Sequence, residues 1–497
     1  MSDHSVKDEE KNVVYTEDVD KRIAGSSSTT NEKDTTPNNV WAGTPEERRL
    51  KRKINAFIYP LCGLIIFVQF CDKAALSVAP VLGLNTELGL TGSQFSWLGS
   101  IFYLGYLVFQ PPNNLILQRV PHGKYLSVLL VAWGSVMTLT ALCNDFSSLM
   151  ACRFLLGFFE AAALPALYII IATLYRRREQ TIVFGYVTLC NGVGAAIGSA
   201  TSYGIAHMKN ARGITNWRWG QIIYGVLTIT IGIVCWFFLI DKPKHRLLRL
   251  TEQEKLISDE RTQDNAVVKV KTFKWYQIRE ALTEIRYYLM MLAAVCINLQ
   301  NGGMLVFSTT FTLGLGFTPL TSLLLQIPSG LSSSLGVLIC TIVARKTRQL
   351  CYTAFGGLSV GLIGLILLLA IPSGGVKLLG YYLSWASTGS YALIITMIGN
   401  NVKGYTKKIF YNGSLMCFYT IGNFCGPLMM VAKQAPRYLG GIGGFLGGYV
   451  VALICYIIMR IWMSRENKRR LANLTGEPCD IYQDLTDRED KNFIYLL

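Results

Sequence analysis

The sequence predicts an all-helical membrane protein with twelve transmembrane helices in two groups of six. Apolar segments recur along most of the chain, hydrophobic residues make up 51% of it, and charged residues make up only 16%. A membrane-spanning helix needs about 20 mostly apolar residues, and no soluble core needs twelve such segments in series. The polar stretch 241–286 separates the sixth apolar segment from the seventh.

Hydropathy and interrupting charges set the expected bounds of each span. The first group is expected at 54–81, 95–117, 125–143, 147–175, 181–206 and 219–240. The second is expected at 287–313, 320–344, 350–371, 376–400, 409–432 and 439–463. Asp72 and Lys73 interrupt the first span, so a short helix followed by a re-entrant piece is the alternative. Prolines are expected to bend helices 2, 4, 8 and 11, at Pro111, Pro112, Pro165, Pro328 and Pro427.

The remaining segments are polar. Residues 1–46 are rich in Ser, Thr, Asn and Asp and bury too little apolar surface to order themselves. The tail after Arg470 is similar. We expect five parts, namely a disordered N-terminal tail (1–53), a six-helix half (54–240), a linker (241–286), a second six-helix half (287–463) and a C-terminal tail (464–497).

The placement of lysine and arginine predicts the orientation, because cytosolic loops carry an excess of both. Short loops on one side carry eleven such residues, against six on the other. The richer set is Arg119, Lys124, Arg176, Arg177, Arg178, Arg345, Lys346, Arg348, Lys403, Lys407 and Lys408. Both termini are therefore expected in the cytosol, with the plasma membrane as the expected location and the endoplasmic reticulum membrane as the alternative. The net charge of +16 follows from this topology, so no nucleic-acid partner is invoked.

Missing motifs exclude several classes of protein. The chain has no G-x-x-x-x-G-K-[ST] loop, so ATP does not drive it directly. Because no nucleophile constellation and no Cys/His cluster at metal spacing occurs, we expect no enzyme, cofactor or metal site. The thirteen cysteines lie mainly within spans, with no paired set in the outer loops. Two six-helix groups are instead typical of secondary transporters, whose site lies near the midplane between the halves.

Charged side chains within spans are the first candidates for such a site, because hydrocarbon makes them costly unless they are paired or hydrated. Arg153 and Glu160 lie on nearly one face of the fourth helix, about two turns apart. Arg153 is expected either to bind a substrate carboxylate or to pair with Asp72 or backbone carbonyls. Asp72 is expected either to carry a coupling proton or to form a static ion pair with Arg153 or Lys73.

Glu160 and Lys73 carry similar alternatives. Glu160 stands among alanines without an intrahelical partner, so it either carries the proton or bonds to a neighbouring helix. Lys73 either attracts a substrate anion or extends its stem to the outer surface.

Four amide side chains at mid-span are further candidates for substrate binding, namely Asn298, Gln300, Asn301 and Asn423. Gly302 and Gly303 follow the first three, which predicts an interrupted seventh helix that bends around a ligand. The alternative is that these amides join helices to one another.

Local sequence resembles a known family along nearly the whole stretch from 54 to 470. The segments that carry the resemblance are FCDKAALSVAPVLGL (70–84), CRFLLGFFEAAALPALYIIIATLYRRREQ (152–180), WRWGQIIYGVLTITIGIVCWFFLIDKP (217–243), NVKGYTKK (401–408), APRY (435–438) and RENKRR (465–470). They are similar to motifs of fungal major facilitator transporters of the allantoate permease group, nearest the branch with cysteine and thiamine-pathway carriers.

The resemblance implies a monomeric alternating-access carrier that imports a small organic anion together with a proton. A carboxylate nutrient, vitamin, ureide or sulfur-containing amino acid fits this description. The spans alone also permit a uniporter or an exchanger. A nutrient sensor that keeps the fold but moves little substrate is the alternative from another class.

Overall fold

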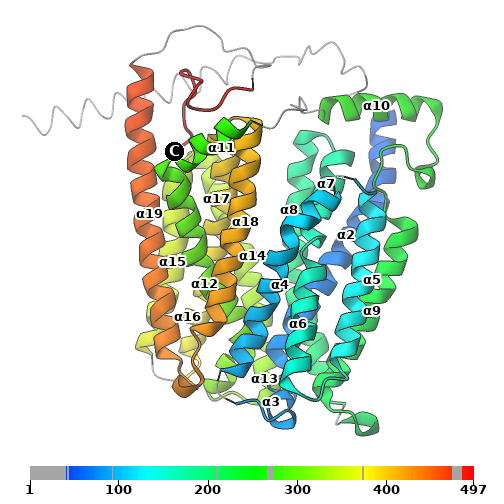
Figure 1. Cartoon of the computed structure of the whole chain (residues 1–497), viewed down its shortest axis with the longest axis vertical. Coiled ribbons are helices and arrows are strands. Elements are labelled where there is room, and N and C mark those ends of the chain that lie inside the picture. Colours follow the sequence, from blue (N-terminus) through cyan, green and yellow to red (C-terminus); the bar gives the residue numbers. More distant parts are fainter. Residues whose placement is uncertain are drawn as a thin grey trace, which may run out of the picture.

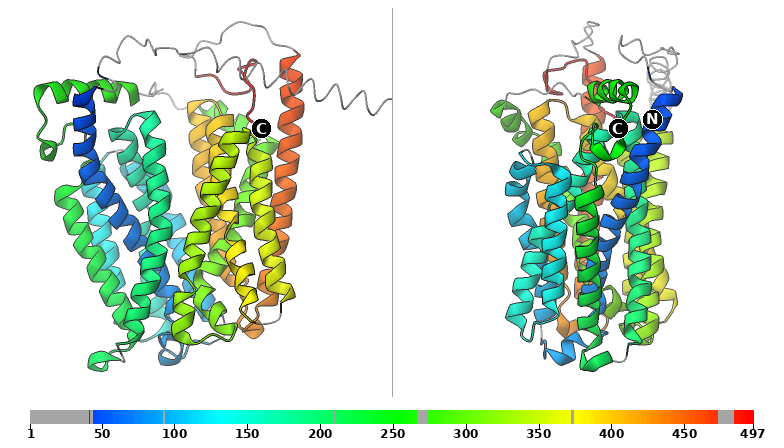
Figure 2. Two further views of the ribbon diagram at one scale, coloured as in Figure 1. Left: turned by 180° about the vertical axis from the view of Figure 1, so that it is seen from behind. Right: turned by 90° about the vertical axis from the view of Figure 1, so that its right-hand side faces the viewer.

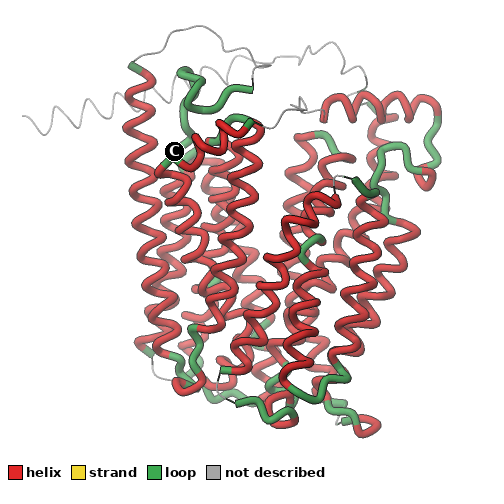
Figure 3. The backbone as a smooth tube through the Cα atoms, in the orientation of Figure 1, coloured by secondary structure: helices red, strands yellow, loops and turns green. Residues whose placement is uncertain are grey.

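The computed structural model describes residue 41 and residues 44–91, 93–117, 119–208, 210–265, 274–371, 374–472 and 484–497. Long helices stand side by side in two bundles (Figure 1), and the described elements are helices joined by loops (Figure 3). The first bundle contains α2 (Pro45–Val78), α4 (Gln94–Leu117), α5 (His122–Thr140), α6 (Phe146–Glu160), α7 (Ala163–Leu174), α8 (Arg177–Ala206) and α9 (Asn216–Phe238). The short helix α3 (Leu84–Glu87) follows α2.

The second bundle contains α12 (Ile285–Gly314), α13 (Pro319–Leu324), α14 (Ile327–Thr347), α15 (Leu350–Ala370), α16 (Val376–Ser384), α17 (Ser387–Asn401), α18 (Tyr405–Leu428) and α19 (Leu439–Leu471). Two linker helices, α10 (Glu252–Asn265) and α11 (Trp275–Leu282), lie at the bundle ends near the chain termini (Figure 1). Among described residues, nine helical stretches are long and apolar enough to cross a membrane. The predicted spans at 95–117, 376–400 and 409–432 also coincide with helices, in α4, α16–α17 and α18.

Three spans are built from two helices each. Pro165 lacks an N–H to bond the carbonyl of Ala161, and the fourth span is broken there, between α6 and α7. Pro328 similarly follows the break between α13 and α14. The break between α16 and α17 contains no proline, and the expected span at 376–400 did not include it. Asp72 and Lys73, by contrast, lie inside a continuous α2, so the re-entrant alternative is wrong.

The seventh helix is not interrupted, so the predicted bend at Gly302 and Gly303 is wrong. A Cβ atom at Gly302 would lie 2.5 Å from the carbonyl oxygen of Asn423, and one at Gly426 would lie 2.2 Å from that of Leu299. The glycines therefore let α12 and α18 approach closely, which is the common role of small residues between membrane helices.

The two bundles converge at the end opposite the chain termini, which we call the far side, and diverge toward the other end, the terminal side (Figures 1 and 2). At the far side, Ser100 Oγ donates to the carbonyl of Phe424 at 2.7 Å, and Ser96 Oγ donates to that of Met430 at 3.2 Å. The apolar core of the second bundle continues into the first through far-side residues such as Phe95. The structure is therefore sealed at the far side.

A glycine contributes to this seal, and replacing that glycine with a larger residue is expected to open the far side. A Cβ atom at Gly99 of α4 would lie 2.7 Å from a methyl of Val306 of α12. Gly99→Leu should destabilise the sealed state by ~1–3 kcal/mol of overpacking. A cysteine introduced at Ser100 should then react faster with a membrane-impermeant maleimide. Gly447→Leu is the control, because Gly447 has open surroundings, and equal labelling of the two variants would contradict the assignment.

The C-terminal tail was expected to lack order, and for residues 484–497 that expectation is wrong. This segment, which we call the C-terminal strap, packs on the second bundle (Figure 1). Asp487 is fully buried, and its carboxylate pairs with Arg286 and, at 2.8 Å, with Lys407 Nζ. The expected N-terminal tail is also shorter, since α2 begins at Pro45, whereas residues 1–40 and 42–43 lie outside the described part.

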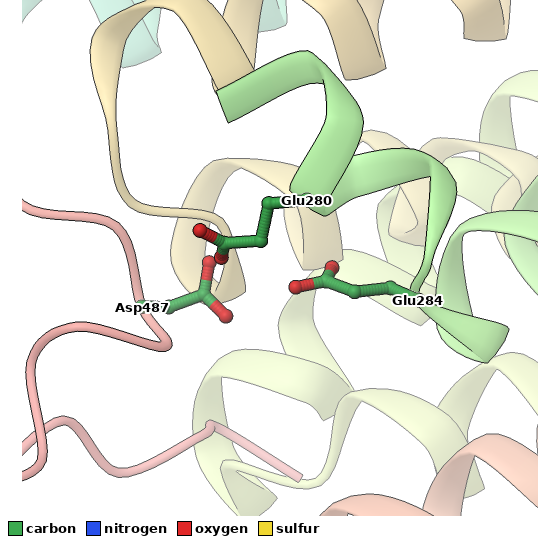
Figure 4. Close-up of side chains that lie close together, drawn as sticks. All are labelled: Glu280, Glu284 and Asp487. Carbon is green, nitrogen blue, oxygen red and sulfur yellow. The ribbon is translucent and has the colours of Figure 1, made fainter. Parts of the chain in front are cut away.

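Three carboxylates under the strap lie close enough together to hold a metal ion, namely those of Glu280, Glu284 and Asp487 (Figure 4). All three, however, contact the ammonium group of Lys407, at 2.7, 2.5 and 2.8 Å. Arg286 and Arg488 also contact Glu284, at 2.8 and 3.7 Å, so three cations face the three carboxylates. The cluster is therefore an ion-pair network that joins α11, α18 and the strap.

Candidate functional site

A cavity of about 330 Å³ lies between the two bundles. Its walls come from α2, α8, α12, α14, α16, α17 and α18, and from α12 they include residues near the middle of that helix. Hydroxyl, amide and aromatic side chains predominate, including Ser77, Ser308, Asn301, Tyr391 and Tyr419. The lining therefore combines apolar surface with polar groups that can bond to a solute, as is usual for small-molecule sites.

Lys73 is the one charged side chain among the described residues that line this cavity. Its ammonium group lies 3.2 Å from Glu160 Oε1, and its side chain keeps 18% of its surface exposed. Glu160 is fully buried and also accepts a hydrogen bond of 2.8 Å from Gln69 Nε2. Lys73 therefore does not extend to the outer surface, and Glu160 has partners on a neighbouring helix.

Asp72 and Arg153 form a second buried pair beside the first. Arg153 Nη1 lies 3.6 Å from Asp72 Oδ1, and Trp133 Nε1 donates to Asp72 Oδ2 at 2.9 Å. A void of about 30 Å³, lined by Asp72, Lys73 and Arg153 among others, adjoins the pair and is large enough for one water molecule. The structure does not bring Arg153 to the large cavity, whose lining contains neither member of this pair.

Three of the four amide candidates lie at or next to the cavity, and the fourth lies away from it. Asn298 and Asn301 line the cavity, and Asn423 connects them: it donates to Asn298 Oδ1 at 3.3 Å and accepts from Asn301 Nδ2 at 2.8 Å. Gln300 faces away from the cavity, where it bonds to Ser384 and to Tyr449. Its side chain joins α12 to α16 and α19, as expected from the alternative in which these amides link helices to one another.

Several lining residues had no signal in the sequence. Trp385 lies at the unpredicted break between α16 and α17, lines the cavity, and has no hydrogen-bond partner for its buried indole N–H among the described residues. Tyr391 and Tyr419 lie on different helices of the second bundle, yet their rings are 5.5 Å apart. Aromatic residues are so common in spans that only their position in the fold distinguishes these.

Comparisons with known proteins identify the family. The model of the Major Facilitator Superfamily matches residues 62–427. The chain belongs to this superfamily. The allantoate permease of Saccharomyces cerevisiae is 33% identical over 479 residues, which cover 91% of this chain and 87% of the permease. The thiamine pathway transporter of the same yeast is 28% identical over 479 residues, which cover 95% of this chain and 91% of that transporter.

A solved structure shows that the fold is also shared. A bacterial homologue of the human lysosomal transporter Spinster, in an inward-facing and occupied conformation, superposes with a TM-score of 0.63 at 14% identity. The match covers 82% of this chain and 96% of that one. The predictions of a twelve-helix major facilitator fold and of a relationship to the allantoate permease group are therefore confirmed. This superfamily member is a multi-pass membrane transport protein.

Proposed function

We propose that this transporter imports a small organic anion together with a proton by alternating access. The observation that carries the proposal is the Lys73–Glu160 ion pair, because one partner faces the cavity and the other is buried behind it. The relatives support a small polar solute, since one is named for allantoate and another for the thiamine pathway.

The pair offers a direct way to couple the two solutes. A carboxylate that enters the cavity competes with Glu160 for the ammonium group of Lys73, since both anions need the same cation. A buried carboxylate that loses its cation becomes strongly unfavourable. Glu160 then accepts a proton, so that anion and proton are bound together. When the anion leaves, Lys73 returns to Glu160 and the proton is released.

The neighbouring groups have supporting roles in this proposal. Asn298 and Asn301 bind polar groups of the substrate, with Asn423 holding their amides in place. Asp72 and Arg153 lie toward the sealed far side, where they serve the outward-facing state: Arg153 attracts the incoming anion and Asp72 is a second proton acceptor.

Charge placement supports the orientation. Because the loops and flanks richer in lysine and arginine lie on the terminal side, we place that side in the cytosol and the far side outside the cell, with the protein in the plasma membrane. The described conformation, sealed at the far side, then faces the cytosol. A monomer suffices for this mechanism, since both bundles that form the cavity belong to one chain.

Uptake in intact cells tests the function. Cells that lack competing carriers are given a panel of labelled organic acids at two external pH values, with wild type beside Lys73→Gln. Uptake should rise with external acidity and fall at least tenfold in the variant. Lys433→Gln is the control, since Lys433 is exposed at the far side. Uptake that ignores an imposed pH gradient, or that persists in Lys73→Gln, would refute the proposal.

A further inference from the structure

Two cysteine sulfur atoms at the far side are in contact. Cys143 Sγ and Cys152 Sγ lie 3.7 Å apart. Cys143 belongs to the loop between α5 and α6, and Cys152 to the second turn of α6. Cys143 is buried, whereas Cys152 is half-buried and so within reach of a small reagent. Since Cys143 is in a loop and Cys152 is in a helix, the pair is not one that the cysteines of the outer loops alone could reveal.

The loop between the two cysteines is held in place by hydrogen bonds. Asp145 caps the N-terminus of α6, and its carboxylate accepts a hydrogen bond from the backbone N–H of Ser148 at 3.0 Å. Arg218 of α9 reaches across to Asn144 Oδ1 at 2.9 Å and also donates to the carbonyl of Ala141. The contact between the sulfur atoms is therefore built into the packing of three helices.

We propose that Cys143 and Cys152 are a disulfide-forming pair on the extracellular face of the transporter. The inference rests on the proposed orientation, which places the far side in the oxidising compartments that the chain meets during secretion and at the cell surface. Bond formation needs the two sulfurs to approach from 3.7 Å to about 2.05 Å. A rotation of the half-buried Cys152 side chain and a small loop movement supply this.

The chemistry is thiol–disulfide exchange with a low-molecular-weight disulfide such as oxidised glutathione. The Cys152 thiol loses its proton and attacks one sulfur of the reagent, which forms a mixed disulfide and releases one small thiol. The Cys143 thiol then loses its proton, attacks the Cys152 sulfur and releases the second small thiol. The protein loses two protons and two electrons, and the reagent gains both.

The bond has a consequence for the candidate site. Cys152 directly precedes Arg153, whose guanidinium contacts Asp72. A disulfide ties this turn of α6 to the end of α5, which limits how far the backbone of Arg153 moves when the bundles rock. Reduction is therefore expected to change the transport rate and to lower the melting temperature of the protein.

Mass spectrometry of the full-length protein tests the bond. Membranes are denatured and alkylated without reduction, so that buried thiols also react. Cleavage after Phe146, between the two cysteines, should yield a linked peptide about 2 Da lighter than its two parts. In Cys152→Ser, Cys143 should become alkylated, whereas Cys417→Ser, which changes a half-buried cysteine on α18, should keep the linked peptide. Alkylation of both Cys143 and Cys152 in the wild type would overturn the proposal.

A second measurement separates this inference from the orientation on which it rests. An epitope tag at Met1 should bind antibody only after the cells are permeabilised. If the cysteines are alkylated and the tag is hidden in intact cells, the disulfide alone is refuted. If the cysteines are alkylated and the tag is accessible, the orientation and the disulfide are both refuted. Where the bond is present, a reductant should change the uptake rate of wild type and of Cys417→Ser, and leave Cys152→Ser unchanged.

Discussion

Glu160→Gln is expected to abolish pH-driven accumulation of substrate while exchange of internal for external substrate continues. Glutamine has nearly the same shape and still accepts the hydrogen bond from Gln69, but it takes no proton and no longer competes for Lys73. With one proton per anion, accumulation should grow about tenfold for each unit of pH difference in the wild type. In the variant, the internal concentration should show no dependence on that difference.

The measurement is accumulation at steady state, with counterflow of labelled substrate as the test of exchange. Glu87→Gln is the matched control, because Glu87 is also a carboxylate paired with a cation, Arg218, but lies outside the cavity. Its accumulation should follow the wild type. If accumulation by Glu160→Gln still rises with external acidity, another group carries the coupling proton. Asp72→Asn is then the variant to test.

The sequence predicts the twelve spans well because each carries its own apolar signal. The interruption at Asp72 and Lys73 was misleading for a physical reason. The two charges are matched by Arg153 and Glu160 on a helix about 80 residues later, at 3.6 and 3.2 Å, so α2 has no need to break. Hydropathy is read along one segment at a time and does not register such pairing.

The site was only partly predictable for the same reason. Charged residues within spans pointed to the region of the cavity, but the rotation of each helix decides which of them faces it. Lys73 does and Arg153 does not, although a guanidinium matches the geometry of a carboxylate better than an ammonium group does. The glycines of α12 illustrate a second limit, since close packing against α18 and local bending leave the same sequence signal.

The order of the C-terminal strap was the largest omission, because its partners are scattered over 200 residues of sequence. Arg470 donates to the carbonyl groups of Asp487 and Phe493 at 2.8 and 2.9 Å. Asn467 exchanges hydrogen bonds of 2.8 and 2.9 Å with the backbone of Tyr495. No local composition rule identifies a polar tail that is ordered by buried charges elsewhere.

Removing the central charge of this network should therefore destabilise the protein. Asp487→Ala leaves the fully buried Arg286 paired with Glu284 but without its strap carboxylate, and takes one of three carboxylates from Lys407. Breaking a buried ion pair on one side costs about 3–5 kcal/mol, so the variant in detergent should unfold at a clearly lower temperature. Asp259→Ala is the control, because Asp259 pairs with Lys244 at the surface, where both side chains are about half exposed.

The loss of stability in Asp487→Ala should also depend on pH in a defined direction. Burial raises the pKa of Asp487, but Arg286 and Lys407 outweigh it and hold that pKa below its ordinary value. A carboxylate with a lowered pKa in the folded protein stabilises it fully above the unfolded value of about 3.9. That contribution is lost as the pH falls through the lower folded value. The gap in melting temperature between wild type and Asp487→Ala should therefore be constant near neutrality and shrink only in strong acid. If Asp487→Ala has the same melting temperature as Asp259→Ala at neutral pH, the strap contacts add no stability.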